Sequence, residues 1–418
     1  MKDAISKRGG MFLPIRSFQQ NGFTIPLLFL GWFISSMDRM FINIAIVPIG
    51  EELHMDAASL GIVLSIFYLG YTLMQIPGGW LADRYGSKIA IVTTILVFSL
   101  FAGLSGLAWS VTSLLVIRFI FGLGEGAFPG AATKLMSENV APEKRTRTQS
   151  VLLVAITLGG FVASLGGAYF ITQIGWRNTY LSLGILGVIL ALMYFFFLRS
   201  KPAAASDSTT SEQQTVTLRA LLKSTAMWKI MLALFGLYTA MWGLSSWVPS
   251  YLMNVRKINL LDAGIYASFP TLAGMIGYLV GGWLVDKIFA NREKYVIIFG
   301  NFLAALSIYA MFTVESLALT ILAQVVAGFS FQVAYMGILA MPLKQLPSQI
   351  MGSAFGMLNT GANLASFLTP AIMGALIQAF HGSYEIAFAY LIVGNVVSLV
   401  MGLFLGKTKK LFAATPHS

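Results

Sequence analysis

Long apolar stretches separated by short polar segments run through the whole chain. Each stretch has about 20 residues with few charges, the length that an α-helix needs to cross the hydrocarbon core of a bilayer. Strands of a membrane barrel would be shorter and would alternate apolar with polar residues, so the pattern predicts helices. We expect twelve membrane-spanning helices, over residues 24–48, 59–79, 88–108, 111–132, 149–172, 178–198, 228–252, 262–284, 294–314, 317–340, 352–376 and 384–405.

One longer polar segment, residues 199–226, leaves six predicted spans on each side. It is rich in Ala, Ser and Thr and poor in large apolar residues, as linkers are. The two sides also resemble each other, since GGWLADRYG at 78–86 recurs as GGWLVDKIF at 281–289, just after the second span of each side. We therefore predict an N-terminal six-helix bundle over 1–198, a cytoplasmic linker and a C-terminal six-helix bundle over 227–418. Such repeats occur in transporters whose halves rock around a central site.

The basic residues are distributed unevenly among the predicted loops. The chain is 57% hydrophobic and 10% charged, with a formal net charge of +11. Of its 27 Lys and Arg, 22 fall on the side of the two termini, three on the opposite side and two within spans. This asymmetry places both termini in the cytoplasm of a cell whose inner (cytoplasmic) membrane the chain crosses many times. The positive charge thus reflects topology, and we expect no nucleic-acid partner.

The sequence lacks the residues that several kinds of functional site require. There is no cysteine, and the three histidines (His54, His381 and His417) lie in predicted loops or the tail, so we expect no metal site and no cofactor other than protons as coupling ion. A membrane enzyme would need a catalytic cluster that the sequence does not offer, and no phosphate-binding ATPase motif is present. GLGEGA at 122–127 matches a dinucleotide fingerprint, but inside an apolar span small residues indicate close helix packing.

Four charged residues fall well inside predicted spans, away from their ends, and all four lie in the first half: Asp38, Arg39, Arg118 and Glu125. A charge at the bilayer centre costs about 2.5–3.5 kcal/mol on insertion scales, and such residues usually mark a pathway or a relay. Arg118 and Glu125 are two turns apart on one helix face, about 10 Å along the axis. Asp38 and Arg39 are adjacent, point about 100° apart and cannot face the same neighbour.

These four charges suggest a coupling mechanism. They sum to zero when both acids are ionised, and protonation of Asp38 or Glu125 leaves an arginine unpaired in a low dielectric. An anion could then pair with that arginine, so that protons and anion favour each other's binding. The alternative is a purely structural ion-pair network, in a chain that exchanges anions or lets them diffuse without proton coupling.

Two sequence motifs indicate a family. GGWLADRYGSK at 78–88 resembles the loop between helices two and three of the major facilitator superfamily, and VIRFIFGLGEGAFPG at 116–130 resembles its fourth helix. The similarity covers nearly the whole chain and implies two six-helix bundles in a pseudo-twofold arrangement. Helix five lacks the Gly-Pro pair of proton-coupled drug antiporters, which argues against drug export. The resemblance also implies conformational gating by charge pairing that stabilises the outward-facing state, at Gly79, Asp83, Arg84 and the repeat-related Asp286.

A narrower resemblance concerns the anion:cation symporter family within that superfamily. It rests on the adjacent Asp and Arg of helix one, on YTLMQIPGGW at 71–80 and on the Arg-x6-Glu spacing of helix four. It implies proton-coupled uptake of a small organic anion by a monomer, with a sugar acid (hexuronate, aldonate or aldarate) as substrate. Other carboxylates, aromatic ones included, remain the alternative. The implied roles are proton sites at Asp38 and Glu125, an arginine coupled to the helix-four glutamate at Arg118, a carboxylate-binding Arg39 and a site-lining Tyr71.

Organophosphate exchangers of the same fold carry an arginine in each half. The predicted seventh span, 228–252, has none, so phosphate esters fit less well. Polar residues at helical spacing complete the predicted site, because amides and hydroxyls suit a polyhydroxylated ligand. Packing between helices is the alternative for each of them, and helix five offers only Thr157 where some members have a glutamine. The predicted substrate-binding set is Arg39, Tyr71, Gln75, Trp242, Asn359, Asn363 and Ser366, with Ser245, Ser246, Trp247, Gln324, Gln332 and Tyr335 as further candidates.

Overall fold

The computed structural model describes residues 22–140, 142–198, 221–346 and 348–405. The regular elements of these ranges are helices, with no strand. The first half contains α1 (Thr24–Glu52), α2 (Ala57–Tyr85), α3 (Ser87–Ser105), α4 (Val111–Gly126), α5 (Phe128–Asn139) and α6 (Pro142–Phe197). The second half contains α8 (Thr225–Asn254), α9 (Leu260–Trp283), the π-helical η1 (Leu284–Ile288), α10 (Lys294–Thr313), α11 (Leu317–Gln345), α12 (Ser348–Ala379) and α13 (Tyr384–Phe404).

The predicted spans match these helices, several of which run beyond the predicted bounds, as α2 does at both ends. Eleven helical stretches of the described chain are long and apolar enough to cross a membrane. One of them contains two predicted spans, because α6 is interrupted at Gly175, where φ is 77° and ψ is 160°. A glycine adopts such a conformation without steric cost, so the chain turns back there and α6 provides two crossings. The predicted span 111–132 is divided into α4 and α5 at Ala127.

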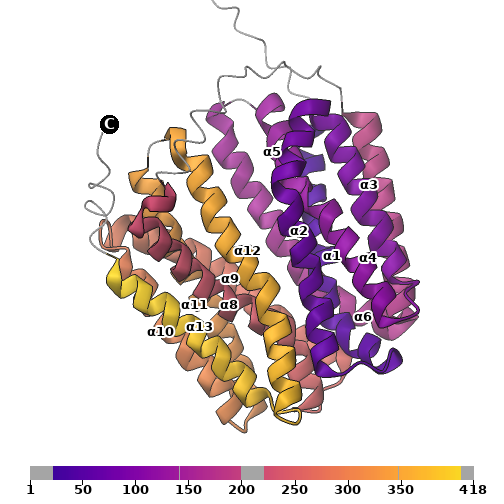
Figure 1. Cartoon of the computed structure of the whole chain (residues 1–418), viewed down its shortest axis with the longest axis vertical. Coiled ribbons are helices and arrows are strands. Elements are labelled where there is room, and N and C mark those ends of the chain that lie inside the picture. The colour runs from indigo at the N-terminus through magenta and orange to yellow at the C-terminus, as the bar shows by residue number, and fades with distance from the viewer. Residues whose placement is uncertain (1–21, 141, 199–220, 347, 406–418) are drawn as a thin grey trace, which may run out of the picture.

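The helices form two bundles that lie side by side (Figure 1). Within the first, α1 packs on α6 and α2 on α4; within the second, α10 packs on α11 and α13 on α8. The bundles converge at one end, here called the closed end, and diverge at the other (Figure 1). Of the predicted linker, residues 199–220 lie outside the described residues, and α8 already begins at Thr225.

Glycines allow the two bundles to touch at the closed end, where α2 crosses α12. A Cβ added at Gly61 would lie 2.5 Å from the carbonyl oxygen of Pro370, and one at Gly374 would lie 3.0 Å from the Cα of Gly61. Side chains at these positions would hold the backbones apart, as at other close crossings of membrane helices. A second crossing joins α6 and α9, where Gly264 packs against Ala168.

Hydrogen bonds between the bundles accompany the α2–α12 crossing. The Ala371 N–H donates to Ser65 Oγ at 2.9 Å, which satisfies a backbone donor next to the helix-breaking Pro370. Nearer the membrane surface, Gln378 Nε2 donates to Asp56 Oδ2 at 2.9 Å, and Gln378 Oε1 accepts from the Ala58 N–H at 3.1 Å. Hydrogen bonds from Ser59 and then Gln378 lower the pKa of Asp56, so this carboxylate stays ionised near neutral pH.

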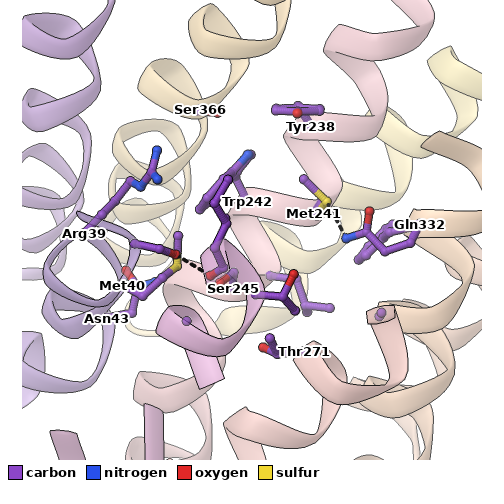
Figure 2. Close-up of a pocket in the computed structure, with 18 of the residues that line it drawn as sticks. Arg39, Met40, Asn43, Tyr238, Met241, Trp242, Ser245, Thr271, Gln332 and Ser366 are labelled. Atoms are coloured by element: carbon purple, nitrogen blue, oxygen red, sulfur yellow. Dashed lines mark hydrogen bonds between the residues drawn. The ribbon is translucent and has the colours of Figure 1, made fainter. Parts of the chain in front are cut away.

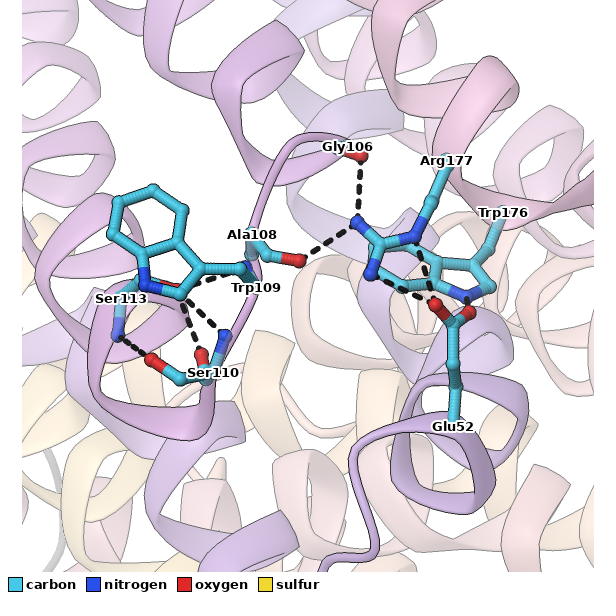
Figure 3. A network of polar contacts seen from close by, with 8 residues as sticks. All are labelled: Glu52, Gly106, Ala108, Trp109, Ser110, Ser113, Trp176 and Arg177. Carbon is cyan, nitrogen blue, oxygen red and sulfur yellow. Dashed lines mark hydrogen bonds and ion pairs between the residues drawn. The ribbon is translucent and has the colours of Figure 1, made fainter.

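An ion pair between Arg177 and Glu52 connects helices at the closed end of the first bundle (Figure 3). Arg177 pairs with Glu52, with 2.8 Å between Nη2 and Oε1, and Trp176 Nε1 donates to Glu52 Oε2 at 2.7 Å. Arg177 Nη1 also donates to the carbonyl oxygens of Gly106 at 3.0 Å and Ala108 at 2.7 Å, which follow α3. A cation at the C-terminal end of a helix satisfies its free carbonyls and complements its dipole. One guanidinium thus links three helix ends.

We predict that Gly61→Ala shifts the protein away from this conformation. The added methyl overlaps Pro370, and overpacking of this kind costs about 1–3 kcal/mol. Since the chain has no cysteine of its own, Ser65→Cys provides a specific probe for a membrane-impermeant maleimide added at the closed end. Labelling should be roughly five-fold faster or more in Gly61→Ala. Gly356→Ala on α12 is the control, because a Cβ there meets nothing within 4 Å. Equal labelling in both variants would contradict the prediction.

Candidate functional site

A cavity of about 530 Å³ lies between the two bundles. Its volume is in the range of sites for small molecules. Residues of α1, α2 and α6 form one wall, and residues of α8, α9, α11 and α12 form the other (Figure 2). All seven predicted substrate-binding residues line it: Arg39, Tyr71, Gln75, Trp242, Asn359, Asn363 and Ser366.

Arg39 of α1 brings a positive charge to the wall of the cavity. Its side chain is 11% exposed, and its Nε lies 3.5 Å from Glu125 Oε1 of α4. No hydrogen bond is made by this Nε within the described residues, so the ion pair is loose. The guanidinium also lies 5.5 Å from the ring centroid of Tyr71, within range of a cation–π interaction. The Arg39 guanidinium therefore lies between the carboxylate of Glu125 and the cavity.

Glu125 is buried behind Arg39 and is held by one further group. Ser35 Oγ donates to Glu125 Oε1 at 2.8 Å, while Glu125 Oε2 has no partner among the described residues. At 1% exposure the carboxylate is shielded from the cavity by the arginine. A buried carboxylate with one ion-pair partner and one hydroxyl donor is poised to change its charge when that partner moves.

Asp38 and Arg118 are a second buried acid and base. Asp38 lies within electrostatic range of Glu125 and of Arg118, yet both Asp38 oxygens and the Arg118 Nε and Nη1 atoms have no hydrogen-bond partner in the described part of the chain. The Arg118 guanidinium lies 5.3 Å from the ring centroid of Phe67 and 5.1 Å from that of Phe121. The hydroxyl of Tyr180, also without a partner among these residues, lies within electrostatic range of both charges.

Glu125 interacts with both arginines of the buried group. Its ion pair among the described residues is with Arg39. Arg118 also lies within electrostatic range of Glu125, so its predicted coupling to this acid stays a prediction. Asp38 in turn lies within electrostatic range of both Glu125 and Arg118.

The wall opposite Arg39 consists of neutral polar and aromatic side chains (Figure 2). Gln332 Nε2 of α11 lies 3.5 Å from Met241 Sδ, a weak acceptor, and Gln332 Oε1 has no partner among the described residues. Ring contacts connect Trp242 to Tyr238 at 6.5 Å and Tyr238 to Tyr335 at 6.1 Å. The Trp242 indole N–H likewise lacks a partner in this part of the chain. These groups can offer hydrogen bonds and ring faces to a ligand.

Two repeat-related clusters lie at the diverging end. Lys134 Nζ pairs with Asp83 at 3.1 Å and donates to the Ala82 carbonyl at 2.8 Å. In the second half, Lys344 Nζ pairs with Asp286 at 3.3 Å and donates to the carbonyl of Val285 at 3.0 Å. The two sequence repeats therefore occupy equivalent positions. Both aspartates are paired within their own half in this conformation.

The other two predicted gating residues lie beside Asp83. Arg84 stacks on neighbouring rings, with 5.1 Å between its guanidinium and the centroid of Trp80. Gly79 lies against α5, because a Cβ added at Gly130 would be 2.9 Å from the Gly79 Cα. The gating role of all four residues stays a prediction.

Residues 28–370 match the family model of the Major Facilitator Superfamily. The chain belongs to this superfamily. Among its relatives, the probable sulfoacetate transporter SauU of Cupriavidus necator is 30% identical over 399 residues, 90% of this chain and 92% of that protein. The hexuronate transporter of Bacillus subtilis is 26% identical over 400 residues, 90% of this chain and 95% of the relative. A bacterial homologue of the human lysosomal transporter Spinster shares the fold, with a TM-score of 0.77 at 20% identity over 95% and 96% of the two chains.

The two-bundle major facilitator fold predicted from the sequence is therefore confirmed. Of the further candidate residues, Ser245, Gln332 and Tyr335 line the cavity, and Thr157 lines it as well. Gln324 is buried in the second bundle, and the indole N–H of Trp247 donates to the Pro370 carbonyl at 3.2 Å. Neither of these two belongs to the lining, nor does Ser246. The site roles of the lining residues stay predictions that the geometry supports.

Sequence reasoning missed several residues of this superfamily site. Tyr68, Tyr238, Tyr278 and Trp32 line the cavity, but aromatic residues at helical spacing look the same in packing and in binding. Ser35 is the donor to Glu125, although a hydroxyl inside a helix more often bonds its own backbone. Its position three residues before Asp38 was the available signal.

We predict that Ser35→Ala changes the pH dependence of transport. The Ser35 hydroxyl favours the ionised carboxylate of Glu125, so its loss makes protonation easier. Half-maximal transport should move toward higher pH by roughly one unit, the scale of one hydrogen bond to a charged group. Ser36→Ala is the matched control, because Ser36 Oγ donates to the Ile156 carbonyl at 2.7 Å and not to an acid. A shift toward lower pH, or equal profiles of the two variants, would contradict the prediction.

Proposed function

We propose that this chain is a secondary active transporter that takes up a small organic anion together with protons. One observation carries the proposal: Arg39 is shared between the cavity wall and the buried Glu125. A single cation that faces an acid on one side and a ligand cavity on the other can pair with the acid or with an anionic substrate. Its two partners therefore compete for it.

That competition couples the substrate to protons. Protonation of Glu125 removes its negative charge and leaves Arg39 without a full counter-charge, which is costly in a low dielectric. A substrate anion in the cavity then pairs with Arg39, so protonation strengthens anion binding. Linkage requires the converse, that the bound anion raises the proton affinity of the site. Asp38 and Arg118 form a second buried acid–base pair behind the first and provide a second proton site.

Alternating access follows from the arrangement of the two bundles. With both termini in the cytoplasm, the closed end faces outward and the conformation described here is inward-facing, in the inner membrane of a bacterium. The outward-facing conformation requires α2 and α12 to separate at the closed end and the two bundles to approach each other at the diverging end. Asp83 and Asp286, with their lysines, lie where the two halves would then approach, and we assign them to gating.

The proposed substrate is a sugar acid. Arg39 suits a carboxylate, and the amides of Asn359, Asn363 and Gln332 suit hydroxyl groups. One relative is named for hexuronate, which is a sugar acid, and another for sulfoacetate, which is a small organic anion of another class. The aromatic side chains of the cavity favour a second candidate, an aromatic carboxylate stacked on Trp242.

Uptake into proteoliposomes tests the proposal. The purified protein is supplied with labelled sugar acids and aromatic carboxylates, with an imposed inward proton gradient and without one. Accumulation of a sugar acid above its equilibrium level only with the gradient is the expected result. Equal uptake with and without the gradient would contradict symport and would leave uncoupled exchange or facilitated diffusion.

A further inference from the structure

The charges around the cavity are all on one side. Among the described residues that line it, Arg39 is the single charged side chain. Asp38, Arg118 and Glu125 lie behind the wall, each about 1% exposed, where a substrate does not reach them. The cavity therefore provides one direct counter-charge to a ligand.

The far end of the cavity is neutral. Gln332 and Met241 lie across the cavity from Arg39, and Trp242 lies between this pair and Arg39 (Figure 2). Tyr335 is in ring contact with Tyr278, 5.9 Å between centroids, and continues this wall on α11 and α9. The polar atoms there are an amide, phenol hydroxyls and an indole N–H, and two of them, Gln332 Oε1 and Trp242 Nε1, have no partner within the described residues.

Such a wall discriminates against a second negative charge. The faces of aromatic rings carry negative charge and repel anions, whereas C–H groups of a sugar pack well on them. Unpaired amide and indole groups bind neutral hydroxyls, which both donate and accept hydrogen bonds. A carboxylate placed there would lose its water without gaining a cation, and this penalty is large.

We infer that the substrate carries one negative group, held at Arg39, and an uncharged polar end that lies against Gln332, Trp242 and Tyr335. This inference rests on the proposed function and narrows its substrate class. Monoanions such as aldonates and hexuronates fit, and dianions such as aldarates do not. The relatives do not decide the matter, because they are named for monoanions such as hexuronate and also for dianions such as sulfoacetate and galactarate.

Binding of matched compounds tests this inference. The full-length purified protein is titrated at neutral pH with galactonate, galacturonate, galactarate and galactitol, and with 3-hydroxybenzoate and isophthalate as an aromatic pair. Thermal stabilisation reports binding independently of proton coupling. In each series whose monoanion binds, that monoanion should bind about 100-fold more tightly than the dianion, and galactitol should bind weakly. The inference is overturned if a dianion binds as tightly as its monoanion, or if no monoanion binds.

A charge added at the far wall provides a second test. Gln332→Lys places a cation opposite Arg39, so the ratio of galactarate to galacturonate affinity should rise about tenfold or more. Gln332→Leu is the control, because it removes the amide without adding charge and should weaken both ligands without raising that ratio. An unchanged ratio in Gln332→Lys would count against the inference. If dianions bind and still accumulate with the proton gradient, the proposed function stands and this inference alone fails.

Discussion

Replacing Arg39 with alanine should abolish substrate binding and transport. The side chain provides the cavity's counter-charge among the described lining residues, and a substrate carboxylate would lose that partner. Truncating one partner of a buried charge pair costs about 2–5 kcal/mol, a loss of roughly 30-fold to several thousand-fold in affinity. Counterflow, in which labelled substrate exchanges with unlabelled substrate inside vesicles, measures this loss without a proton gradient.

Two further variants separate a lost contact from a misfolded protein. Arg39→Ala leaves Glu125 buried without its cation, whereas the double variant Arg39→Ala/Glu125→Gln removes both charges of the pair. The double variant should regain thermal stability and should still not bind substrate. Arg39→Lys keeps the charge but loses the planar fork, so an intermediate affinity is expected. Counterflow by Arg39→Ala at the wild-type rate would refute the assignment of this residue.

Replacing Glu125 with glutamine should separate exchange from accumulation. Glutamine mimics the protonated acid, so Arg39 remains free for the substrate and binding persists. No proton is then taken up or released at this position, and the accumulation ratio under an imposed proton gradient should fall several-fold below wild type, with Asp38 as the remaining proposed proton site. Counterflow should stay within about threefold of wild type, because the ligand contacts are intact.

The control for this variant is Glu52→Gln. Glu52 also pairs with an arginine, Arg177, but at the closed end and outside the cavity. Its neutralisation should leave accumulation dependent on the gradient, even if the protein becomes less stable. If Glu125→Gln accumulates substrate with the gradient to the wild-type ratio, Glu125 does not couple protons and is a structural partner of Arg39.

The sequence predicted the fold well because the bilayer restricts what a chain can do. Length and hydropathy located the crossings, and the repeat at Asp83 and Asp286 located equivalent loops of the two halves. The boundary that it missed has a local cause. The reversal at Gly175 falls in the gap between the predicted spans 149–172 and 178–198, whereas the turn at Ala127 that divides α4 from α5 lies within an apolar run.

The candidate site was predictable only where burial is costly. Asp38, Arg39, Arg118 and Glu125 stood out because charges are rare inside spans. Which charges pair was not predictable, since it depends on how α1 and α4 are rotated against each other. Neutral residues such as Tyr238 gave no signal, because a ring that lines a cavity and a ring in a packed core have the same spacing.

Proton uptake on substrate binding would show directly whether anion and proton bind together. Substrate is added to the purified protein in weakly buffered detergent solution near neutral pH, and a pH-sensitive dye records the protons taken from solution. We expect net proton uptake by the wild-type protein and much less by Glu125→Gln, although that variant still binds. Substrate binding to the wild-type protein without proton uptake, or with proton release, would contradict the coupling of anion and proton at Arg39 and Glu125.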